Sequence, residues 1–310
     1  MNTVKKLHLK LFELSQGSRQ IMHLGLGMTL FFPRPFGDVR AAMWDLWQKY
    51  LAFVGKEKLT WSRLGGGNRS RVVNASTFRT IEAWLTGTKD YGKDCWISIH
   101  DGPMDGLGQY GFELEGLGAP GEDEEDVGCL DMRFPVDWIE SVQGPVLAAQ
   151  LISLATKVPF YCGTAGFVFH RASHEFDATV GKMAALSKRF EGVEVSASHR
   201  ERYWAAKGLV SVNWITLLGD GLIAKLGARN ALSKKLPVGC EVIPLDHGVA
   251  VRSGDLPLLG DKNSGQDELR LWRNVYQVLK PVQFVDTIYE FDPFDFDGKR
   301  TAEWLQRLDI

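Results

Sequence analysis

Gly208-Leu-Val-Ser-Val-Asn-Trp-Ile-Thr-Leu-Leu-Gly219 is the stretch around which the rest of the chain is best interpreted. It is apolar, rich in β-branched residues and bounded by glycine at both ends, which is typical of a buried strand. The segments after it predict short helices over 220–226 and 228–236 and strands over 240–244 and 248–252. The C-terminal third therefore predicts strands and helices that pack together.

Two further features complete this third of the chain. Residues 254–265 are rich in Gly, Pro, Asn and Asp, and this composition indicates a shaped loop. Apolar residues then follow at helical spacing, namely Trp272, Val275, Tyr276 and Leu279. They predict a core-facing helix that ends at Lys280-Pro281.

The N-terminal part predicts the same mixture of elements. Val4 to Leu14 alternates like a half-buried strand, and the nearly continuous apolar run 21–32 predicts a central strand. Residues 36–54 predict a helix with a core-facing stripe, and Ser76 is a candidate cap for the helix that ends at Leu85. Residues 158–170 predict a strand with Gly163 and Gly166 as bulge points.

These patterns together predict an α+β fold, with mixed or antiparallel sheets flanked by helices. Weak similarity between the two parts favours two α+β halves, residues 1–157 and 158–310, that share a tight interface and can be counted as a single domain. At 310 residues the chain is long enough to bury a large core.

Composition excludes several classes of protein. The net charge of −2 gives no general attraction to nucleic acid, and no apolar run is long enough to span a membrane. The first residues alternate and carry lysines too closely spaced for a signal peptide, so we expect a cytoplasmic protein. The four cysteines are far apart in sequence, which predicts free buried thiols rather than a disulfide framework or a zinc knuckle.

Three histidine–aspartate or histidine–histidine pairs are candidates for chemistry: His100 with Asp101, His170 with His174, and Asp246 with His247. None accompanies a recognisable nucleophile or oxyanion motif, and each has a simpler structural interpretation. The second pair has the spacing of zinc ligands on a helix, but its first histidine ends a predicted strand. We therefore predict no catalytic residue, no metal and no cofactor, and a hydrolase that uses one of these pairs is the alternative.

A glycine-rich segment flanked by arginines is also ambiguous. Gly65-Gly-Gly67 lies near Arg63, Arg69 and Arg71, and glycines beside arginines can bind phosphate. The spacing matches no known phosphate loop, so a hairpin loop with solvated arginines is the favoured interpretation.

Acidic residues are concentrated in two places. One is the run Glu122, Asp123, Glu124, Glu125 and Asp126, and the other is an aromatic-rich segment that carries Asp292, Asp295 and Asp297. The run must be exposed because five consecutive acids repel one another, and it lacks the pattern of a calcium-binding loop. A solvated loop explains it, but acids and aromatics also suit a surface that binds a basic partner. These eight residues are the predicted partner contacts.

Several segments of the C-terminal third resemble the bacterial type VI secretion immunity protein family. They are Val-Asn-Trp-Ile-Thr-Leu-Leu-Gly over 212–219, Gly-Asp-Leu-Pro-Leu-Leu-Gly-Asp-Lys-Asn over 254–263, the tyrosine-containing helix that ends at Pro281, and the closing segment 300–309. Residues 28–53 fit the pattern more loosely, and 102–131 do not align with it.

The resemblance implies a cytoplasmic protein that binds and neutralises a toxic effector, often a nuclease, without catalysis. A nuclease presents a basic cleft to nucleic acid, and carboxylates with aromatics could plug that cleft. An inhibitor could equally bind another surface and block folding, assembly or loading of the effector. The sequence does not choose between these modes.

Overall fold

One sheet of twelve strands runs through the part of the chain that the structure describes. The structure is a computed structural model, and it describes residues 9–67, 69–91, 94–103, 107–120, 126–172, 175–195, 201–284 and 303–309. The strands are β1 (Leu14–Gln16), β2 (Arg19–Phe32), β3 (Trp61–Leu64), β4 (Arg71–Val72), β5 (Cys95–His100), β6 (Gly111–Gly116), β7 (Gly128–Phe134), β8 (Cys162–Arg171), β9 (Glu194–Val195), β10 (Ile215–Gly219), β11 (Cys240–Leu245) and β12 (Gly248–Ser253).

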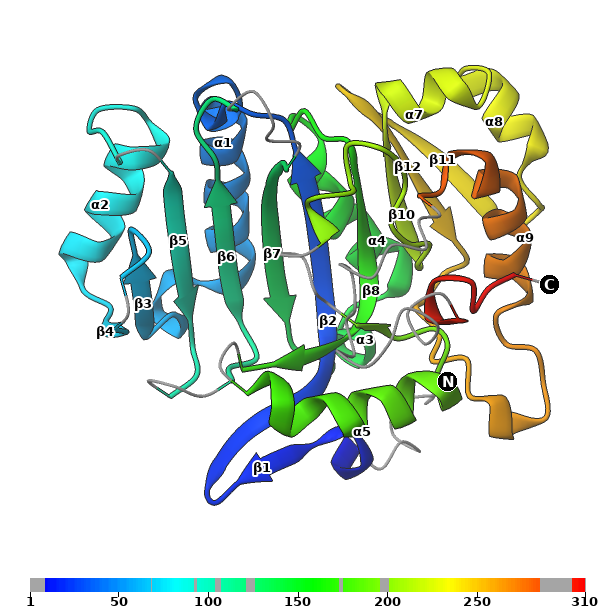
Figure 1. The fold of residues 1–310 in the computed structure, drawn as a ribbon, viewed down its shortest axis with the longest axis horizontal. Helices are drawn as coiled ribbons and strands as arrows, with labels where there is room; N and C mark the ends of the chain where they lie inside the picture. Colours follow the sequence, from blue (N-terminus) through cyan, green and yellow to red (C-terminus); the bar gives the residue numbers. More distant parts are fainter. Residues whose placement is uncertain are drawn as a thin grey trace.

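The strand order across the sheet is β11-β12-β10-β8-β2-β7-β6-β5-β3-β4, with β1 paired to β2 and β9 paired to β8 (Figure 1). Every ladder is antiparallel except that of β8 with β9. The long strand β2 is central, because β7 and β8 pair with it on opposite sides. This confirms the central strand predicted over residues 21–32, where every residue is buried.

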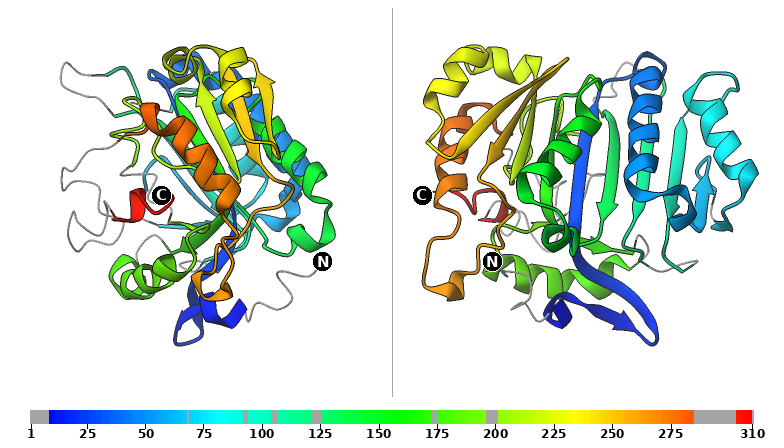
Figure 2. Two further views of the ribbon diagram at one scale, coloured as in Figure 1. Left: turned by 90° about the vertical axis from the view of Figure 1, so that its right-hand side faces the viewer. Right: turned by 180° about the vertical axis from the view of Figure 1, so that it is seen from behind.

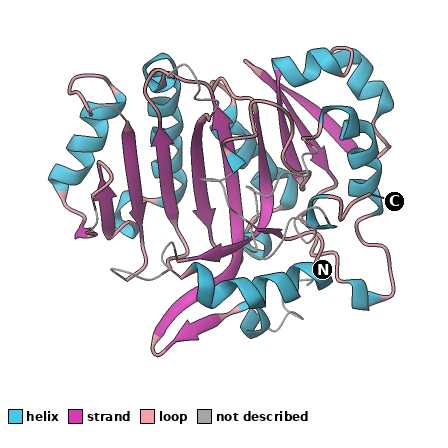
Figure 3. Ribbon diagram, viewed as in Figure 1, coloured by secondary structure: helices cyan, strands magenta, loops and turns pink. Residues whose placement is uncertain are grey.

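The helices are α1 (Phe36–Val54), α2 (Ala75–Leu85), α3 (Trp138–Ser141), α4 (Gly144–Ala155), α5 (Phe176–Arg189), α7 (Asp220–Lys225), α8 (Arg229–Lys235) and α9 (Arg270–Leu279). Short 3-10 turns occupy Leu9–Phe12, Lys56–Lys58, Lys262–Ser264 and Lys280–Val282. Figure 2 shows α1 and α4 over one face of the sheet and α9 on the opposite side, against β12. With helices and one largely antiparallel sheet, the α+β prediction is confirmed (Figure 3).

Helix α1 has the predicted bounds and buries the predicted apolar stripe. Trp47 packs edge-on against Phe112 of β6 with ring centroids 4.8 Å apart, and Tyr50 lies 5.7 Å from the ring of Phe134 in β7. Helix α9 likewise buries Trp272 and the three other apolar residues of its predicted face. The helical spacing of large apolar residues therefore identified two helices that pack on opposite faces of the sheet.

The strand predicted over 208–219 is wrong in length, because β10 begins only at Ile215. Just before and at the start of β10, the side chains of Asn213 and Thr216 form hydrogen bonds with backbone groups. The Trp214 amide donates to Asn213 Oδ1 over 2.7 Å, and Thr216 Oγ1 donates to the Asn213 carbonyl over 3.2 Å. Such local bonds compete with a ladder, so the chain enters the sheet later than its apolar run suggests.

Other predicted details also differ. Leu9–Phe12 is a 3-10 turn rather than part of a strand, and residues 1–8 lie outside the described part of the chain. Asn74, not Ser76, caps α2, since Asn74 Oδ1 accepts from the amides of Ser76 and Thr77. The ladder of β2 with β8 has an unbroken register through Gly163 and Gly166, so neither glycine is a bulge.

The sheet continues through both predicted halves, which meet where β2 pairs with β8. The division at residue 157 stays a prediction.

Among the described residues, no helix combines the length and apolar character needed to cross a membrane.

Candidate functional site

A row of polar side chains crosses the face of the sheet opposite α1. The row consists of residues at matched positions on five neighbouring strands: Arg63 (β3), Ser98 (β5), Glu113 (β6), Asp131 (β7) and Thr29 (β2). The residues that alternate with them, such as Leu114 and Leu130, are buried in the core. Successive side chains of a strand point to opposite faces, so this row lies on the other face of the sheet.

This row lines a cavity of about 340 Å³ over β2, β3, β5, β6, β7 and β8. Figure 1 views these strands from the side opposite α1. Trp96 of β5 also lines the cavity, and it is 39 % exposed, which is unusual for a large aromatic residue. Arg133 and Arg171 contribute further charges. We call this region the sheet cavity.

Hydrogen bonds and ion pairs order the floor of the sheet cavity. Arg133 Nη2 lies 2.6 Å from Glu113 Oε1, and Thr29 Oγ1 donates to Asp131 Oδ1 over 2.6 Å. Glu113 and Asp131 lie directly opposite each other on β6 and β7. Like charges at such a position repel, and the contacts with Arg133 and Thr29 offset this repulsion.

Asp126, the last residue of the predicted acidic run, lies beside this region. Its Oδ1 is 2.5 Å from Arg34 Nη1 and its Oδ2 is 3.7 Å from Arg202 Nη2, and its side chain is 14 % exposed. Arg202 also pairs with Glu115, which lines the sheet cavity. The other predicted contacts lie outside the described residues: Glu122, Asp123, Glu124, Glu125, Asp292, Asp295 and Asp297. The role of all eight residues in binding stays a prediction.

One candidate pair lies at a strand end and another in a turn. His100 is the last residue of β5, and Asp101 follows it. The Asp101 carboxylate accepts a hydrogen bond from the Tyr110 amide over 2.8 Å, and burial raises the pKa of this carboxyl group. Asp246 and His247 form the exposed turn between β11 and β12. The structure thus gives a structural role to Asp101 and places the third pair at a hairpin tip.

His170 of the remaining pair is buried in β8, where its Nε2 lies 2.8 Å from the Leu26 carbonyl oxygen. Its ring packs against that of His23, with centroids 5.6 Å apart. Burial lowers the pKa of His23 to about 4 and that of His170 well below its ordinary value. Both imidazoles are therefore neutral near pH 7, and His174 lies outside the described residues.

The described ranges contain no group of three or more His, Cys, Asp or Glu side chains that could hold a metal ion.

Gly65 and Gly66 form the turn between β3 and β4 with φ values of 67° and 69°, which confirms the predicted hairpin. Positive φ explains these two glycines without a phosphate ligand.

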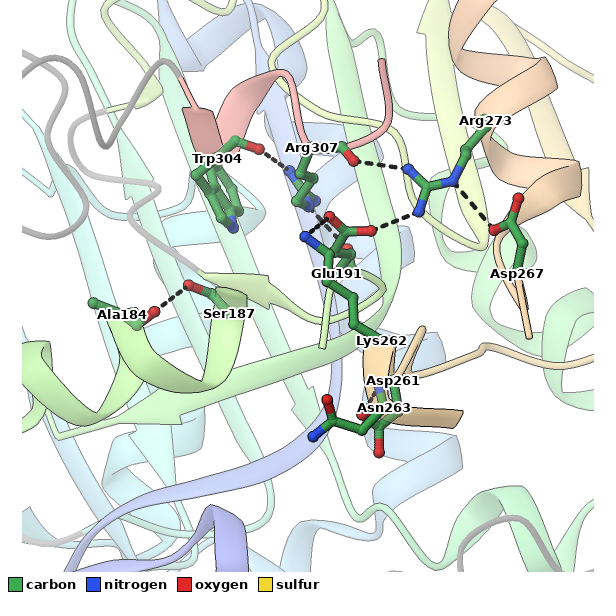
Figure 4. A network of polar contacts seen from close by, with 10 residues as sticks. All are labelled: Ala184, Ser187, Glu191, Asp261, Lys262, Asn263, Asp267, Arg273, Trp304 and Arg307. Atoms are coloured by element: carbon green, nitrogen blue, oxygen red, sulfur yellow. Dashed lines mark hydrogen bonds and ion pairs between the residues drawn. The ribbon is translucent and has the colours of Figure 1, made fainter. Parts of the chain in front are cut away.

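A second polar network joins the C-terminal segment to the body of the protein (Figure 4). Its centre is Glu191, whose carboxylate oxygens lie 2.6 Å from Lys262 Nζ and 2.6 Å from Arg273 Nη2. Arg307 Nε donates to the Glu191 carbonyl over 2.9 Å, and Arg273 Nη1 donates to the Arg307 carbonyl over 2.9 Å. The network therefore connects the end of α5, the 254–265 loop, α9 and the C-terminal segment.

The network continues into the interior through Arg307. Its Nη2 lies 3.4 Å from Glu194 Oε2 and 3.2 Å from Ser211 Oγ, and Ser211 Oγ donates to Glu194 over 2.7 Å. Sequence analysis missed Glu191 and Glu194 because their partners are distant in sequence. Their only local signal was two acids beside an apolar segment.

Comparison with known proteins supports the family resemblance of the C-terminal segments. The family model TsiV, described as type VI immunity for VRR-NUC, matches residues 42–308. This chain belongs to that immunity protein family. The resemblance found in the C-terminal third is confirmed, and the match extends over most of the chain of this immunity protein.

The immunity protein is also similar to a solved structure described as Pseudomonas aeruginosa T6SS protein PA0821. The TM-score is 0.81 at 19 % sequence identity, and the match covers 99 % of this chain and 89 % of that chain. At this identity the likeness shows a shared fold. No curated protein matches the chain.

Proposed function

We propose that this immunity protein binds one cognate VRR-NUC effector, a nuclease, in the cytoplasm and neutralises it by protein–protein contact without catalysis. The observation that carries the proposal is the family match over residues 42–308. An immunity protein for a nuclease needs only to occlude the toxin, and surface complementarity alone can achieve this.

The chemistry of the described surface supports a binding role. The sheet cavity combines charged groups of both signs with a partly exposed tryptophan, Trp96. Aromatic and charged side chains of this kind supply much of the affinity and specificity of protein interfaces. Of the described side chains considered for hydrolysis, Asp101, Asp246 and His247 lie in turns, and His100 and His170 belong to β5 and β8.

A titration distinguishes a binder from a hydrolase. A candidate cognate VRR-NUC effector is mixed with increasing amounts of the immunity protein, and cleavage of duplex DNA is measured. A binder should abolish cleavage at a fixed molar ratio, independent of incubation time. Progressive loss of cleavage at a small fraction of that ratio would show catalysis and contradict the proposal, as would unchanged cleavage at large excess.

The acidic run is part of this proposal. Charge reversal of Glu122, Asp123, Glu124 and Glu125 should speed dissociation of the effector, because these carboxylates would face a basic surface. Asp126 is left intact in this variant, since it holds Arg34 and Arg202 in place. An unchanged dissociation rate at low salt would exclude the run as a contact.

A further inference from the structure

We propose that the β3–β4 end of the sheet binds a carboxylate-bearing surface of the effector through Arg69, Arg71 and Arg79. We call these three residues the arginine edge. This inference rests on the proposed function and names a second contact, opposite in charge to the acidic run. Figure 1 shows β3, β4 and α2 together at one end of the sheet, far from α7, α8 and α9.

The first support is the uneven distribution of charge along the chain. Six of the eight charged residues between Gly55 and Leu85 are basic, whereas the whole chain has a net charge of −2. The two acids of this stretch, Glu57 and Glu82, form no ion pair with the arginine edge within the described part of the chain. The neighbouring strand β5 has no Asp, Glu, Lys or Arg. This end of the molecule therefore has an excess of positive charge, which suits an acidic partner.

The second support is the accessibility of the three arginines. Arg69 lies in the connection between β3 and β4, Arg71 begins β4 and Arg79 belongs to α2, and all three are exposed. None of them forms an ion pair with another described residue. Arg34 and Arg133, by contrast, are largely buried and pair with carboxylates of this chain. The guanidinium groups of the arginine edge are therefore free to bind carboxylates of a partner in the bidentate geometry that arginine favours.

Apolar side chains beside the arginine edge favour a protein partner over nucleic acid. Val72 of β4 is 62 % exposed. Because β4 is the last strand of the sheet, a partner at this edge can contact both Arg71 and Val72, although their side chains point to opposite faces. The hairpin also meets the sheet cavity at Gly66, which lines it together with Trp96. Protein interfaces combine arginine with apolar and aromatic side chains, whereas a phosphate backbone would leave Val72 exposed to water.

The chemistry of a nuclease can supply the required carboxylates. Nucleases that depend on a divalent metal ion hold it with Asp and Glu side chains, so an inhibitor that covers such a site meets acidic groups. Complementary charge speeds association and fixes the relative orientation of two proteins. A basic contact at the arginine edge and an acidic contact elsewhere would together admit one orientation of the effector.

The test is measurement of Kd and association rate by surface plasmon resonance, with the full chain and a candidate cognate VRR-NUC effector. Arg71→Glu combined with Arg79→Glu should raise Kd roughly tenfold or more, mainly through slower association. The increase should shrink at high salt, because both arginines are exposed. The matched control combines Lys225→Glu with Lys234→Glu, which makes the same change of net charge at exposed positions of α7 and α8. Its Kd should stay within about twofold of wild type.

Thermal unfolding checks that each variant is folded, and Val72→Ser provides a second variant of the same edge that leaves its charge intact. This variant should also raise the Kd for the effector. An unchanged Kd in the folded arginine variant, or an equal rise in the lysine control, would overturn this inference and leave the proposed function standing. Titration of a labelled DNA duplex is run in parallel, and loss of duplex binding with an unchanged effector Kd would assign the arginines to nucleic acid instead. Failure of the wild-type protein to bind VRR-NUC effectors would overturn the proposed function itself.

Discussion

Glu191 and Arg273 form an ion pair, with Arg273 Nη2 2.6 Å from Glu191 Oε2, that joins the end of α5 to α9. The Glu191 side chain is only 7 % exposed and that of Arg273 is 19 % exposed. The guanidinium group also donates to the Arg307 carbonyl. The buried Glu191 carboxylate thus joins the end of α5 to α9 and, through Arg273, to the C-terminal segment.

Glu191→Ala should destabilise the protein by about 3 kcal/mol. The substitution leaves Arg273 without its most buried partner, and removal of one member of a buried pair is costly. Urea unfolding followed by circular dichroism measures the change in the free energy of unfolding.

Lys262→Ala is the control for this pair. Lys262 contacts the same carboxylate at 2.6 Å, but its side chain is 55 % exposed, so its loss should cost less than about 1 kcal/mol. Equal effects of the two substitutions would show that the burial of the Arg273 pair does not govern its contribution.

Gly163→Ala should destabilise the central ladder by about 2 kcal/mol or more. A methyl group there would lie 2.4 Å from the Thr29 carbonyl oxygen of β2, and backbone atoms inside a sheet cannot easily move away. Thermal unfolding provides the measurement.

The matched substitution is Gly181→Ala. Gly181 lies within α5, and an added methyl group would meet no atom within 4 Å. Alanine favours helix over glycine by about 1 kcal/mol, so this variant should be more stable than wild type. Similar effects of the two substitutions on stability would show that the close approach of the Thr29 carbonyl oxygen is not the reason why position 163 needs glycine.

Helices with large apolar stripes could be predicted because their pattern needs no knowledge of distant neighbours. The stripe of α1 and the face of α9 are buried as expected. The start of β10 could not be predicted, because it depends on how Asn213 and Thr216 bond the backbone rather than on the hydrophobicity of the run. Gly163 similarly appeared to be a bulge point, since its neighbour in β2 is more than a hundred residues away.

The polar site was harder to predict than the core. Ser98, Glu113 and Asp131 come from three strands, and only the strand order brings them into one row. Sequence analysis instead favoured dense local runs of acids. Such runs are visible in a sequence, whereas a cavity assembled from alternate residues of several strands leaves single polar residues that look like ordinary solvent-facing positions.

Acid should destabilise the protein through His23 and His170. Burial holds their pKa values below those of the unfolded chain, at about 4 for His23 against 6.5. The unfolded chain therefore binds more protons as the pH falls below 6.5. Stability is fully present above that pH and declines towards pH 4, by about 1.4 kcal/mol per pH unit for one such histidine.

His23→Phe tests this dependence because it removes one of the two groups and keeps an aromatic ring in the same place. Urea unfolding at several values between pH 7 and pH 4.5 gives the slope of stability against pH. The variant should show a shallower slope than wild type. Parallel curves would show that His23 does not titrate differently in the folded and unfolded states.

Glu201 should have the opposite pH dependence, and Glu201→Gln should stabilise the protein at neutral and alkaline pH. Glu201 is 5 % exposed; burial raises its pKa well above 4.5, and the nearby Glu194 and Asp131 carboxylates raise it further. The folded protein keeps this proton while the unfolded chain releases it above about pH 4.5, so stability is lost as the pH rises through the folded pKa.

Glutamine cannot ionise, so the variant should not suffer this loss. Unfolding in urea at pH 4.5, 6 and 8 should show a gain that grows with pH, by about 1.4 kcal/mol per unit while the folded carboxyl stays protonated. A difference between variant and wild type that is the same at all three values would instead reflect packing or hydrogen bonding. In that case the pKa of Glu201 would be the same in the folded protein as in the unfolded chain. Other groups of the folded protein would then have to offset the effects of burial and of the Glu194 and Asp131 carboxylates on this pKa.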